Sequence, residues 1–477
     1  MIRYILAKIW ILKAVFFKIF YEKNLSCNKY LSIFKNPMTK KLLTPFQKFI
    51  QLESLSGILL LIAAFVALIW ANSPYATGYE YFLNVEFGFD SDFFNIKKPL
   101  ILWINDGLMA IFFFLIGLEV KRELLVGELN TVKKALFPLF GAIGGMSVPV
   151  ILFFILNDNP ETDRAWGIPM ATDIAFSLAI LKALGKRVPL ALKVFLTAFA
   201  IVDDIGAVLV IAIFYSNSLE VDLLLYGLLV IGAISFFSLK VYYSKYINIF
   251  VGIIAWLLFL KAGVHPTLAG ILMAFAVPMH RKIRGSGFIE QLKELSEKIS
   301  LNAKPAAVLL TPKQIENIDQ LEDLTEKYQS PLQHTENRLH DWVAYFIIPI
   351  FALANAGVAL SSDVPLEWTL VMNLAICLVL GNSIGITTIV LTAMKLKWVT
   401  APASIRRIHI IGASFIAGVG FTMSIFIATL AFIETPQYVD SAKVGILIGS
   451  LISGIIGASI LYIAGTKNET DAEIVGE

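Results

Sequence analysis

Long runs of apolar residues, separated by short polar connections, fill the chain from Ser56 to Gly465. Most runs approach the roughly 20 residues that a helix needs to cross the hydrocarbon core of a bilayer. Open strand edges and irregular backbone cannot face lipid, so we predict spanning helices rather than barrel strands. The pattern predicts an all-α polytopic membrane protein with about twelve transmembrane helices. The predicted spans are residues 56–71, 99–119, 136–156, 165–183, 189–214, 222–239, 247–261, 265–279, 341–360, 368–394, 408–432 and 442–465.

The composition agrees with a membrane protein. Hydrophobic residues make up 57% of the chain and charged residues 16%, and the mean hydropathy is +0.75, far above the balance of soluble globular proteins. Cys27 and Cys377 are the only cysteines, so we predict neither a disulfide framework nor a thiolate metal site. No motif indicates a nucleotide, a haem or a bound metal, and we expect no cofactor, no enzymatic activity and no nucleic-acid partner.

The polar connections alternate in charge, which predicts the orientation of the chain. Lys and Arg dominate every second connection, and the positive-inside rule places those connections and both termini in the cytoplasm. The connections dominated by Asp and Glu, which we expect on the outer side, are residues 72–97, 157–164, 216–222, 361–367 and 433–440.

Three segments lie outside the predicted spans. Residues 1–54 carry ten Lys and Arg and are predicted to be a basic cytoplasmic appendage, in which Met38 is an alternative start. Residues 280–340 mix charges of both signs and are predicted to be a cytoplasmic insert, largely a solvated linker but helical over 287–300. Residues 467–477 form a cytoplasmic tail. The spans themselves fall into two blocks, eight in residues 55–279 and four in residues 341–466.

Four of the predicted spans contain polar side chains that are unfavourable in lipid. An aspartate at the centre of a bilayer costs roughly 2.5 to 3.5 kcal/mol, so an intramembrane carboxylate marks an ion or proton path by default. The alternative is that these groups only brace helices together, and it applies best to Asp106 beside Asn105. The polar sets are Asn105 and Asp106; Thr172 and Asp173; Asp203 and Asp204; and Asn373, Asn382 and Ser383.

Asp203 and Asp204 are adjacent on one predicted helix, so their side chains point about 100° apart. We therefore expect different roles, with one carboxyl facing a cavity and the other facing a neighbouring helix. Burial and mutual repulsion both favour a neutral carboxyl at physiological pH. Such a carboxyl holds either a proton or a cation, and this exclusivity is the chemical requirement for exchange.

Two spans in separate halves of the chain combine helix breakers with a buried threonine. Gly167 and Pro169 precede Thr172, and the eleventh span carries Gly418 and Gly420 just before Thr422. Paired interrupted helices indicate the central binding site of a transporter. The alternative is that the glycines only allow close packing of helices.

Eight strings of residues carry a resemblance to a known family, the NhaA-type sodium/proton antiporters. The resemblance runs from about Ser54 to Gly465. The strings are W-I-N-D (103–106), G-L-E-V-K-R-E (117–123), A-T-D-I-A-F (171–176), R-V-P-L-A-L-K (187–193), V-D-D-I-G-A (202–207), G-V-H-P-T-L-A-G (263–270), F-A-L-A-N-A-G-V (351–358) and G-F-T-M-S-I-F-I-A (420–428).

The resemblance implies an inverted-repeat transporter fold with two interrupted, crossing helices. It implies alternating-access exchange of Na+ or Li+ for H+ across the inner membrane of a bacterium, and a homodimer formed through the acidic 72–97 connection. The implied ion and proton site contains Asp203, Asp204, Asp173 and Thr172, with Asp204 as the direct ligand of the transported cation. The implied accessory residues are Asp106, Asn382 and Thr422; the residues implied in the pH response are Glu119, Lys121, Arg122, Glu123, His265, Glu336 and His340.

One position departs from the family. Members that resemble this chain carry a lysine in the tenth helix, in a G-K-P-L-G-I string, whereas this chain has Gly381, Asn382 and Ser383. An amide can hydrogen-bond Asp203 but cannot neutralise its charge. If the lysine is one of two proton carriers, its loss predicts electroneutral one-for-one exchange; if both carriers are aspartates, two protons per sodium persist.

Three other functions are compatible with parts of this pattern. In a cation channel, polar helices would line a continuous pore. A channel would not need both Na+ and H+ for transport. A membrane aspartyl protease also needs two buried aspartates, but on separate helices, and the chain has no G-x-G-D string. The third alternative is a transport-impaired homologue whose ion selectivity Asn382 has changed.

Overall fold

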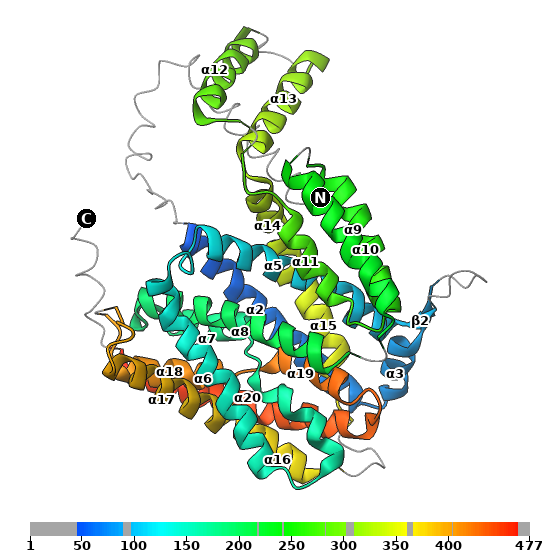
Figure 1. Ribbon diagram of the computed structural model, residues 1–477, viewed down its shortest axis with the longest axis vertical. Coiled ribbons are helices and arrows are strands. Elements are labelled where there is room, and N and C mark those ends of the chain that lie inside the picture. The colour runs from blue at the N-terminus through cyan, green and yellow to red at the C-terminus, as the bar shows by residue number, and fades with distance from the viewer. Residues whose placement is uncertain are drawn as a thin grey trace, which may run out of the picture. The chain divides into compact units, whose positions relative to one another are not determined.

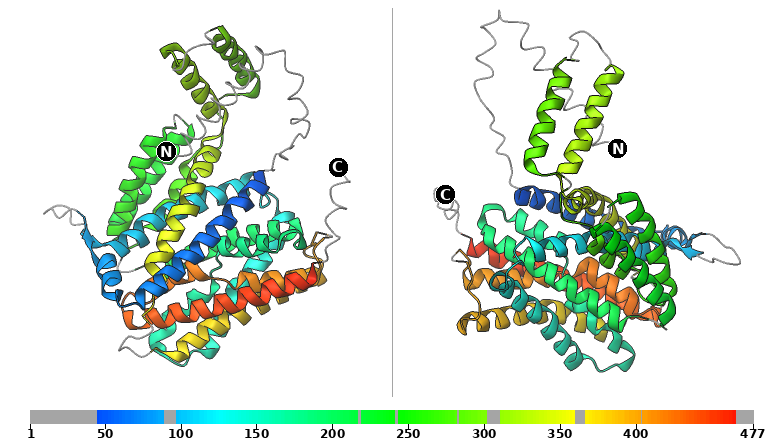
Figure 2. Two further views of the ribbon diagram at one scale, coloured as in Figure 1. Left: turned by 180° about the vertical axis from the view of Figure 1, so that it is seen from behind. Right: turned by 45° about the horizontal axis from the view of Figure 1, so that its top comes forward.

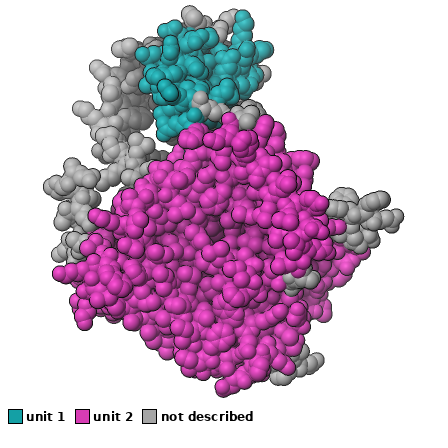
Figure 3. All heavy atoms as spheres, in the orientation of Figure 1, with its two compact units in different colours: residues 1–46, 281–330 teal, residues 47–280, 331–477 magenta. Residues whose placement is uncertain are grey.

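The structure is a computed structural model that describes residues 45–88, 97–216, 219–240, 243–281, 283–301, 310–359, 366–402 and 404–465, with the side chains of 45–55 and 301 left out. The chain divides into two compact units (Figure 3). Unit 1 comprises Met1–Phe46 and Arg281–Ser330, and unit 2 comprises Gln47–His280 and Pro331–Glu477. The predicted appendage and tail lie largely outside the described residues.

The described residues of unit 2 are mainly helical, and they include one short strand pair (Figure 1). Strands β1 (Glu86–Phe87) and β2 (Lys98–Pro99) pair antiparallel. The helices in chain order are α2 (Pro45–Ala71), α3 (Ala76–Asn84), α4 (Leu100–Trp103), η1 (Ile104–Leu108), α5 (Met109–Leu125), α6 (Val132–Leu156), η2 (Pro160–Met170), α7 (Ile174–Ala183), η3 (Gly185–Arg187), α8 (Leu190–Phe214), α9 (Val221–Lys240), α10 (Lys245–Lys261), α11 (Thr267–Ala276), α14 (Pro331–Trp342), η4 (Val343–Ile347), α15 (Ile348–Asn355), α16 (Trp368–Ile376), η5 (Cys377–Gly381), α17 (Asn382–Lys395), α18 (Arg407–Ala417), α19 (Phe421–Ala431), η6 (Pro436–Tyr438) and α20 (Val439–Ala464).

The helices confirm the predicted fold class, an all-α membrane protein. Among the described residues, six helices are long and apolar enough to cross a membrane, or up to eight if each of two bent helix pairs is one span. The remaining predicted spans fall short of that length because they are broken or short; α10 has 17 residues and α11 has 10. The count of about twelve spans stays a prediction.

Unit 1 contains two described helices that pack against each other, α12 (Gly285–Leu301) and α13 (Pro312–Tyr328). The first confirms the helix that the sequence predicts within the insert. The second was predicted to be linker, and the structure corrects this. Thr311 caps it with a capping box, in which the Thr311 side chain accepts from the Gln314 backbone and the Gln314 side chain accepts from the Thr311 backbone, an arrangement that stabilises a helix start.

Several pairs of helices distant in sequence pack side by side in unit 2. Helix α20 packs along α16 and α18, and α6 packs along α17 (Figure 2). Gly144 of α6 and Gly385 of α17 allow the closest of these contacts, because a Cβ at either position would collide with the backbone oxygen of the other. Glycine on both helices lets the two backbones touch.

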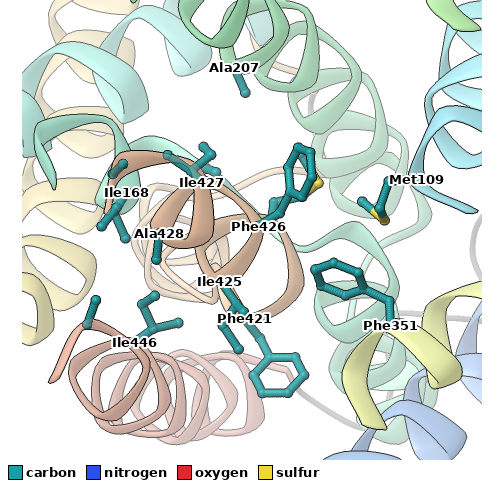
Figure 4. Close-up of a cluster of buried hydrophobic side chains, with 14 of the residues drawn as sticks. Met109, Ile168, Ala207, Phe351, Phe421, Ile425, Phe426, Ile427, Ala428 and Ile446 are labelled. Atoms are coloured by element: carbon teal, nitrogen blue, oxygen red, sulfur yellow. The ribbon is translucent and has the colours of Figure 1, made fainter. Parts of the chain in front are cut away.

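Helix α19 lies in the largest cluster of buried apolar side chains (Figure 4). Nine of its residues are buried, and a helix that is apolar all round belongs in a protein interior. Apolar residues of other elements surround it, among them Met109 of α5, Ile168 of η2, Ala207 of α8, Phe351 of α15 and Ile446 of α20. The packing around α19 fixes the position of its amino-terminal end, at which the candidate site lies.

Candidate functional site

Two helices of unit 2 are interrupted, as the sequence predicts. Element η2 is a 3-10 helix that ends at Met170, and α7 begins only at Ile174. Helix α18 ends at Ala417, and α19 begins at Phe421 with its axis bent by 42°. The short non-helical stretches leave backbone groups without helical partners, and these groups must find other partners inside the protein.

The two interruptions satisfy each other's backbone groups. The Asp173 amide donates to the Val419 carbonyl at 2.7 Å, and the Thr172 hydroxyl donates to the Ala417 carbonyl at 2.9 Å. In return, the Thr422 amide and hydroxyl donate to Asp173 Oδ2 at 3.1 and 2.7 Å. These bonds join segments about 250 residues apart and hold both breaks at one place.

Asp173 connects the amino-terminal ends of two helices. Its Oδ1 accepts from the Phe176 amide at 3.0 Å and so caps α7, while its Oδ2 accepts from the first turn of α19. A carboxylate is stabilised at a helix amino terminus by the free amides and by the helix dipole. The arrangement therefore places negative charge between two helix ends.

Asp203 and Asp204 lie in α8, with 1% and 3% of their surfaces exposed, and they have different surroundings. Asp203 Oδ2 accepts from the Thr172 amide at 3.1 Å. Its Oδ1 is buried without a hydrogen-bond partner among the described residues. Asp204 instead faces a cavity, so the geometry agrees with the expectation of different roles.

The cavity beside Asp204 has a volume of about 50 Å³. A site that holds one water needs roughly 10 to 15 Å³ of such volume, so the cavity has room for about three to five waters, or for one cation with part of its hydration shell. The polar residues that line it are Glu119, Thr172, Asp173, Thr197, Asp204, His340 and Thr422.

The charges around this cavity favour a cation. The carboxyls of Glu119 and Asp173 line the same cavity as that of Asp204, and within the described ranges no Lys or Arg forms an ion pair with Asp203 or Asp204. A carboxylate in these surroundings gains from binding either a proton or a cation. The described residues hold no group of three or more His, Cys, Asp or Glu placed to bind a resident metal ion.

Asn382 does not form the hydrogen bond to Asp203 that an amide at this position could form, but bonds to backbone instead. Its Nδ2 donates to the Pro169 carbonyl at 2.9 Å, and its Oδ1 is buried without a partner among the described residues. The Pro169 carbonyl is available because η2 ends one residue later and no helical amide follows to bond it. Asn382 thus fastens α17 to the interrupted helix.

Three further hydroxyls hold the interrupted segments, and the sequence reasoning missed those of Ser177 and Tyr215. Ser424 donates to the Ile168 carbonyl at 2.8 Å. Ser177 donates to the Ile416 carbonyl at 3.2 Å, and Tyr215 donates to the Arg164 carbonyl at 2.6 Å. Ser177 lies one helical turn after Asp173, and this spacing within an apolar run was the signal that could have found it.

Most residues implied in the pH response gather near one end of α5. Glu119 and His340 line the Asp204 cavity. Arg122 pairs with Glu336 at 3.1 Å and with Glu123 at 2.9 Å. Burial raises the pKa of the Glu336 carboxyl, an effect that Arg122 opposes and Glu123 reinforces. These groups form a coupled cluster directly beside the cavity.

His265 and Asp106 lie elsewhere, together, and do not line the Asp204 cavity. His265 Nε2 is 3.7 Å from Asp106 Oδ1, and Lys98 Nζ is 3.0 Å from Asp106 Oδ2. The neighbouring Asn105 braces the helix, since it exchanges amide hydrogen bonds with Asn355 at 3.2 and 2.8 Å. Asn105 therefore braces the helix, and Asp106 has protein partners of its own in Lys98 and His265.

The sequence profile of the family described as Na+/H+ antiporter 1 matches residues 47–461 of this chain. The chain belongs to the Na+/H+ antiporter 1 family. It is 41% identical over 457 residues to "Na(+)/H(+) antiporter NhaA 1" of Saccharophagus degradans, covering 94% of this chain and 98% of that protein. It is 43% identical to "Na(+)/H(+) antiporter NhaA" of Oleidesulfovibrio alaskensis, covering 89% and 94% of the two chains. The protein of the same name in Wolinella succinogenes is 42% identical, with 86% and 91% covered.

Membership of the Na+/H+ antiporter 1 family confirms the predicted resemblance and class. The chain is a multi-pass membrane transporter and not an enzyme, so the alternative of a membrane aspartyl protease is excluded. The matched region includes both interrupted helices, the Asp203–Asp204 pair and Asn382.

Proposed function

We propose that this protein exchanges Na+ or Li+ for H+ by alternating access, in the inner membrane of a bacterium and with both termini in the cytoplasm. The observation that carries the proposal is the buried Asp204 carboxyl, which faces a cavity of about 50 Å³ at the meeting point of two interrupted helices. Such helices, with their free backbone groups, form the ion sites of several transporter folds.

Asp204 is the proposed direct ligand, and it holds either the cation or a proton. The hydroxyls of Thr172 and Thr422 and the carboxylate of Asp173 line the same cavity and supply further oxygens. Asp203 contacts the backbone of the break through Thr172, so a change of its charge acts on the position of that segment. Competition of two ions for one carboxyl couples their opposite movements.

Sodium-driven release of protons from inside-out membrane vesicles tests this function. The vesicle interior is acidified by respiration and followed with a pH-sensitive dye. We expect that Na+ and Li+ discharge the gradient in vesicles that contain the native chain, and not in vesicles without it. A folded native chain that responds only to K+, or to no cation between pH 6 and 9, would contradict the proposal and support the impaired or altered homologue.

Replacement of the family's lysine by Asn382 predicts electroneutral exchange, because Asn382 cannot carry a proton. On a solid-supported membrane we expect the reconstituted native chain to give no transient current on a sodium jump, while a dye in parallel liposomes reports proton movement. The variant Asn382→Lys, which restores a titratable group, is expected to give a current. A clear current from the native chain would show that two protons move per sodium.

A cation channel is the second candidate. A channel would pass Na+ without a counter-movement of H+, so sodium uptake into liposomes without a proton gradient distinguishes the two functions. Homodimerisation stays a prediction of the family resemblance.

A further inference from the structure

The Asp106 carboxylate forms an ion pair with a lysine of the same chain, Lys98. Lys98 Nζ lies 3.0 Å from Asp106 Oδ2, and the side chains of Lys98 and Asp106 are 29% and 14% exposed. Asp106 lies in η1, a π-helical turn between α4 and α5. The turn is fixed by Trp256 of α10, which donates to the Asp106 carbonyl at 3.1 Å, and by the Asn105–Asn355 pair. A rigid, partly buried carboxylate thus meets an ammonium on a flexible stem.

Asp106 precedes the start of α5 by three residues, and it lies beyond the amino-terminal end of the stretch that lines the Asp204 cavity. Phe112 and Glu119 line that cavity and follow Asp106 by six and 13 residues, which is about 9 and 20 Å along a helix. The charge pattern predicts that this end of the helix faces the outside of the cell, since Arg122 and Lys121 lie at the other end. Asp106 is therefore a carboxylate on the outward side of the central site.

A packed contact links Asp106 to the helix that forms the central site. The His265 ring, 3.7 Å from Asp106 Oδ1, meets the fully buried Phe426 ring edge to face at 5.2 Å. Phe426 lies one turn after Thr422 in α19, and Thr422 binds Asp173. Contacts through His265 and Phe426 thus connect Asp106 to the helix that carries the central site.

We propose that the Asp106 carboxylate is a second, outer station for the exchanged monovalent cation, and that the Lys98 ammonium is a tethered cation that the ion must displace. Both are compact monovalent cations, and Lys98 is held by one ion pair at the end of a four-carbon stem. Its neighbour Lys97 forms a comparable pair with Glu86 at 2.7 Å in a more exposed place. Lys98 therefore sets how readily a cation binds from the outer side, and Lys97 does not.

Amine labelling tests the displacement directly. The native full chain in right-side-out vesicles is treated with a membrane-impermeant acylating reagent, in NaCl or in choline chloride of equal ionic strength, and Lys98 and Lys97 are quantified by mass spectrometry. We expect Na+ to increase labelling of Lys98 several-fold and to leave labelling of Lys97 unchanged. Labelling of Lys98 that is the same in Na+ and choline would overturn the proposal.

Transport kinetics give a second test of the same proposal. In Lys98→Gln we expect KM for Na+ to fall about tenfold at the outer face, a change equivalent to about 1.4 kcal/mol, and to stay unchanged at the cytoplasmic face. Lys97→Gln is the matched control and should change neither. Equal changes at both faces, or none in a folded Lys98→Gln protein, would contradict it. The inference rests on the proposed cation exchange. The labelling measures the reactivity of Lys98 and not transport, so a failure of the inference can be distinguished from a failure of the proposed function.

Discussion

Asp204→Asn is expected to reduce sodium-driven proton release to the level of vesicles that lack the protein. The amide keeps the size of the side chain but cannot take up a proton or present a negative charge to a cation. A loss of at least about two orders of magnitude corresponds to roughly 3 kcal/mol of lost ion binding. The pH-sensitive dye in inside-out vesicles measures it, with the amount of protein matched by immunoblot.

The exposed Asp222 of α9 provides the control. Asp222→Asn makes the same chemical change far from any described cavity and should leave the exchange unchanged. An Asp204→Asn protein that is folded, as judged by its elution from a sizing column, and still exchanges Na+ for H+ would show that Asp204 is not the ion ligand.

Gly385→Ala is expected to lower the stability of the folded protein, because the added methyl group meets the backbone of a neighbouring helix. A Cβ at Gly385 would collide with the backbone oxygen of Gly144 and lie 2.8 Å from Val148 Cβ. Backbone cannot rotate away as a side chain can, so α6 and α17 must separate. Overpacking of this kind typically costs about 1 to 3 kcal/mol, and the measurement is thermal unfolding of the purified protein in detergent.

Gly232→Ala in α9 is the matched control, because a Cβ at Gly232 meets nothing within 4 Å. An alanine there should leave the unfolding temperature unchanged or raise it slightly, since alanine favours helix over glycine. Equal unfolding temperatures for the Gly385 and Gly232 variants would mean that the close contact of α6 with α17 contributes little to stability.

The apolar pattern predicts most of the membrane helices, because hydrophobic length is a property that a single segment carries by itself. The interruptions at Thr172 and at Gly418 to Gly420 were also predictable, since proline and glycine act on their own backbone. Helix α13 was missed, although Thr311, Pro312 and Gln314 form the signature of a capped helix start. Its many charged residues are typical of a solvated linker, and they outweighed the capping signature in the prediction.

The candidate site shows where reasoning from sequence ends. The two aspartates and the threonines were recognisable as misplaced polar groups within apolar runs. Their partners were not, because the bond between Asp173 and Thr422 joins residues 249 positions apart. The true partner of Asn382, the Pro169 carbonyl, is a backbone atom that becomes an acceptor only once η2 has ended. No side-chain pattern encodes an acceptor of this kind.

The hydrogen bonds between the two interruptions constrain the order in which the protein folds during its synthesis. A ribosome delivers the stretch from Ala171 to Asp173 to the membrane long before it makes Ala417, Val419 and Thr422, which bond that stretch in the finished molecule. Until they arrive, the hydroxyl of Thr172 and the amide of Asp173 lack these partners, and lipid offers no hydrogen bonds in their place. The central cavity is therefore among the last features to form, and a chain cut short before α19 carries all four membrane aspartates but lacks the Thr422 amide and hydroxyl that bond Asp173.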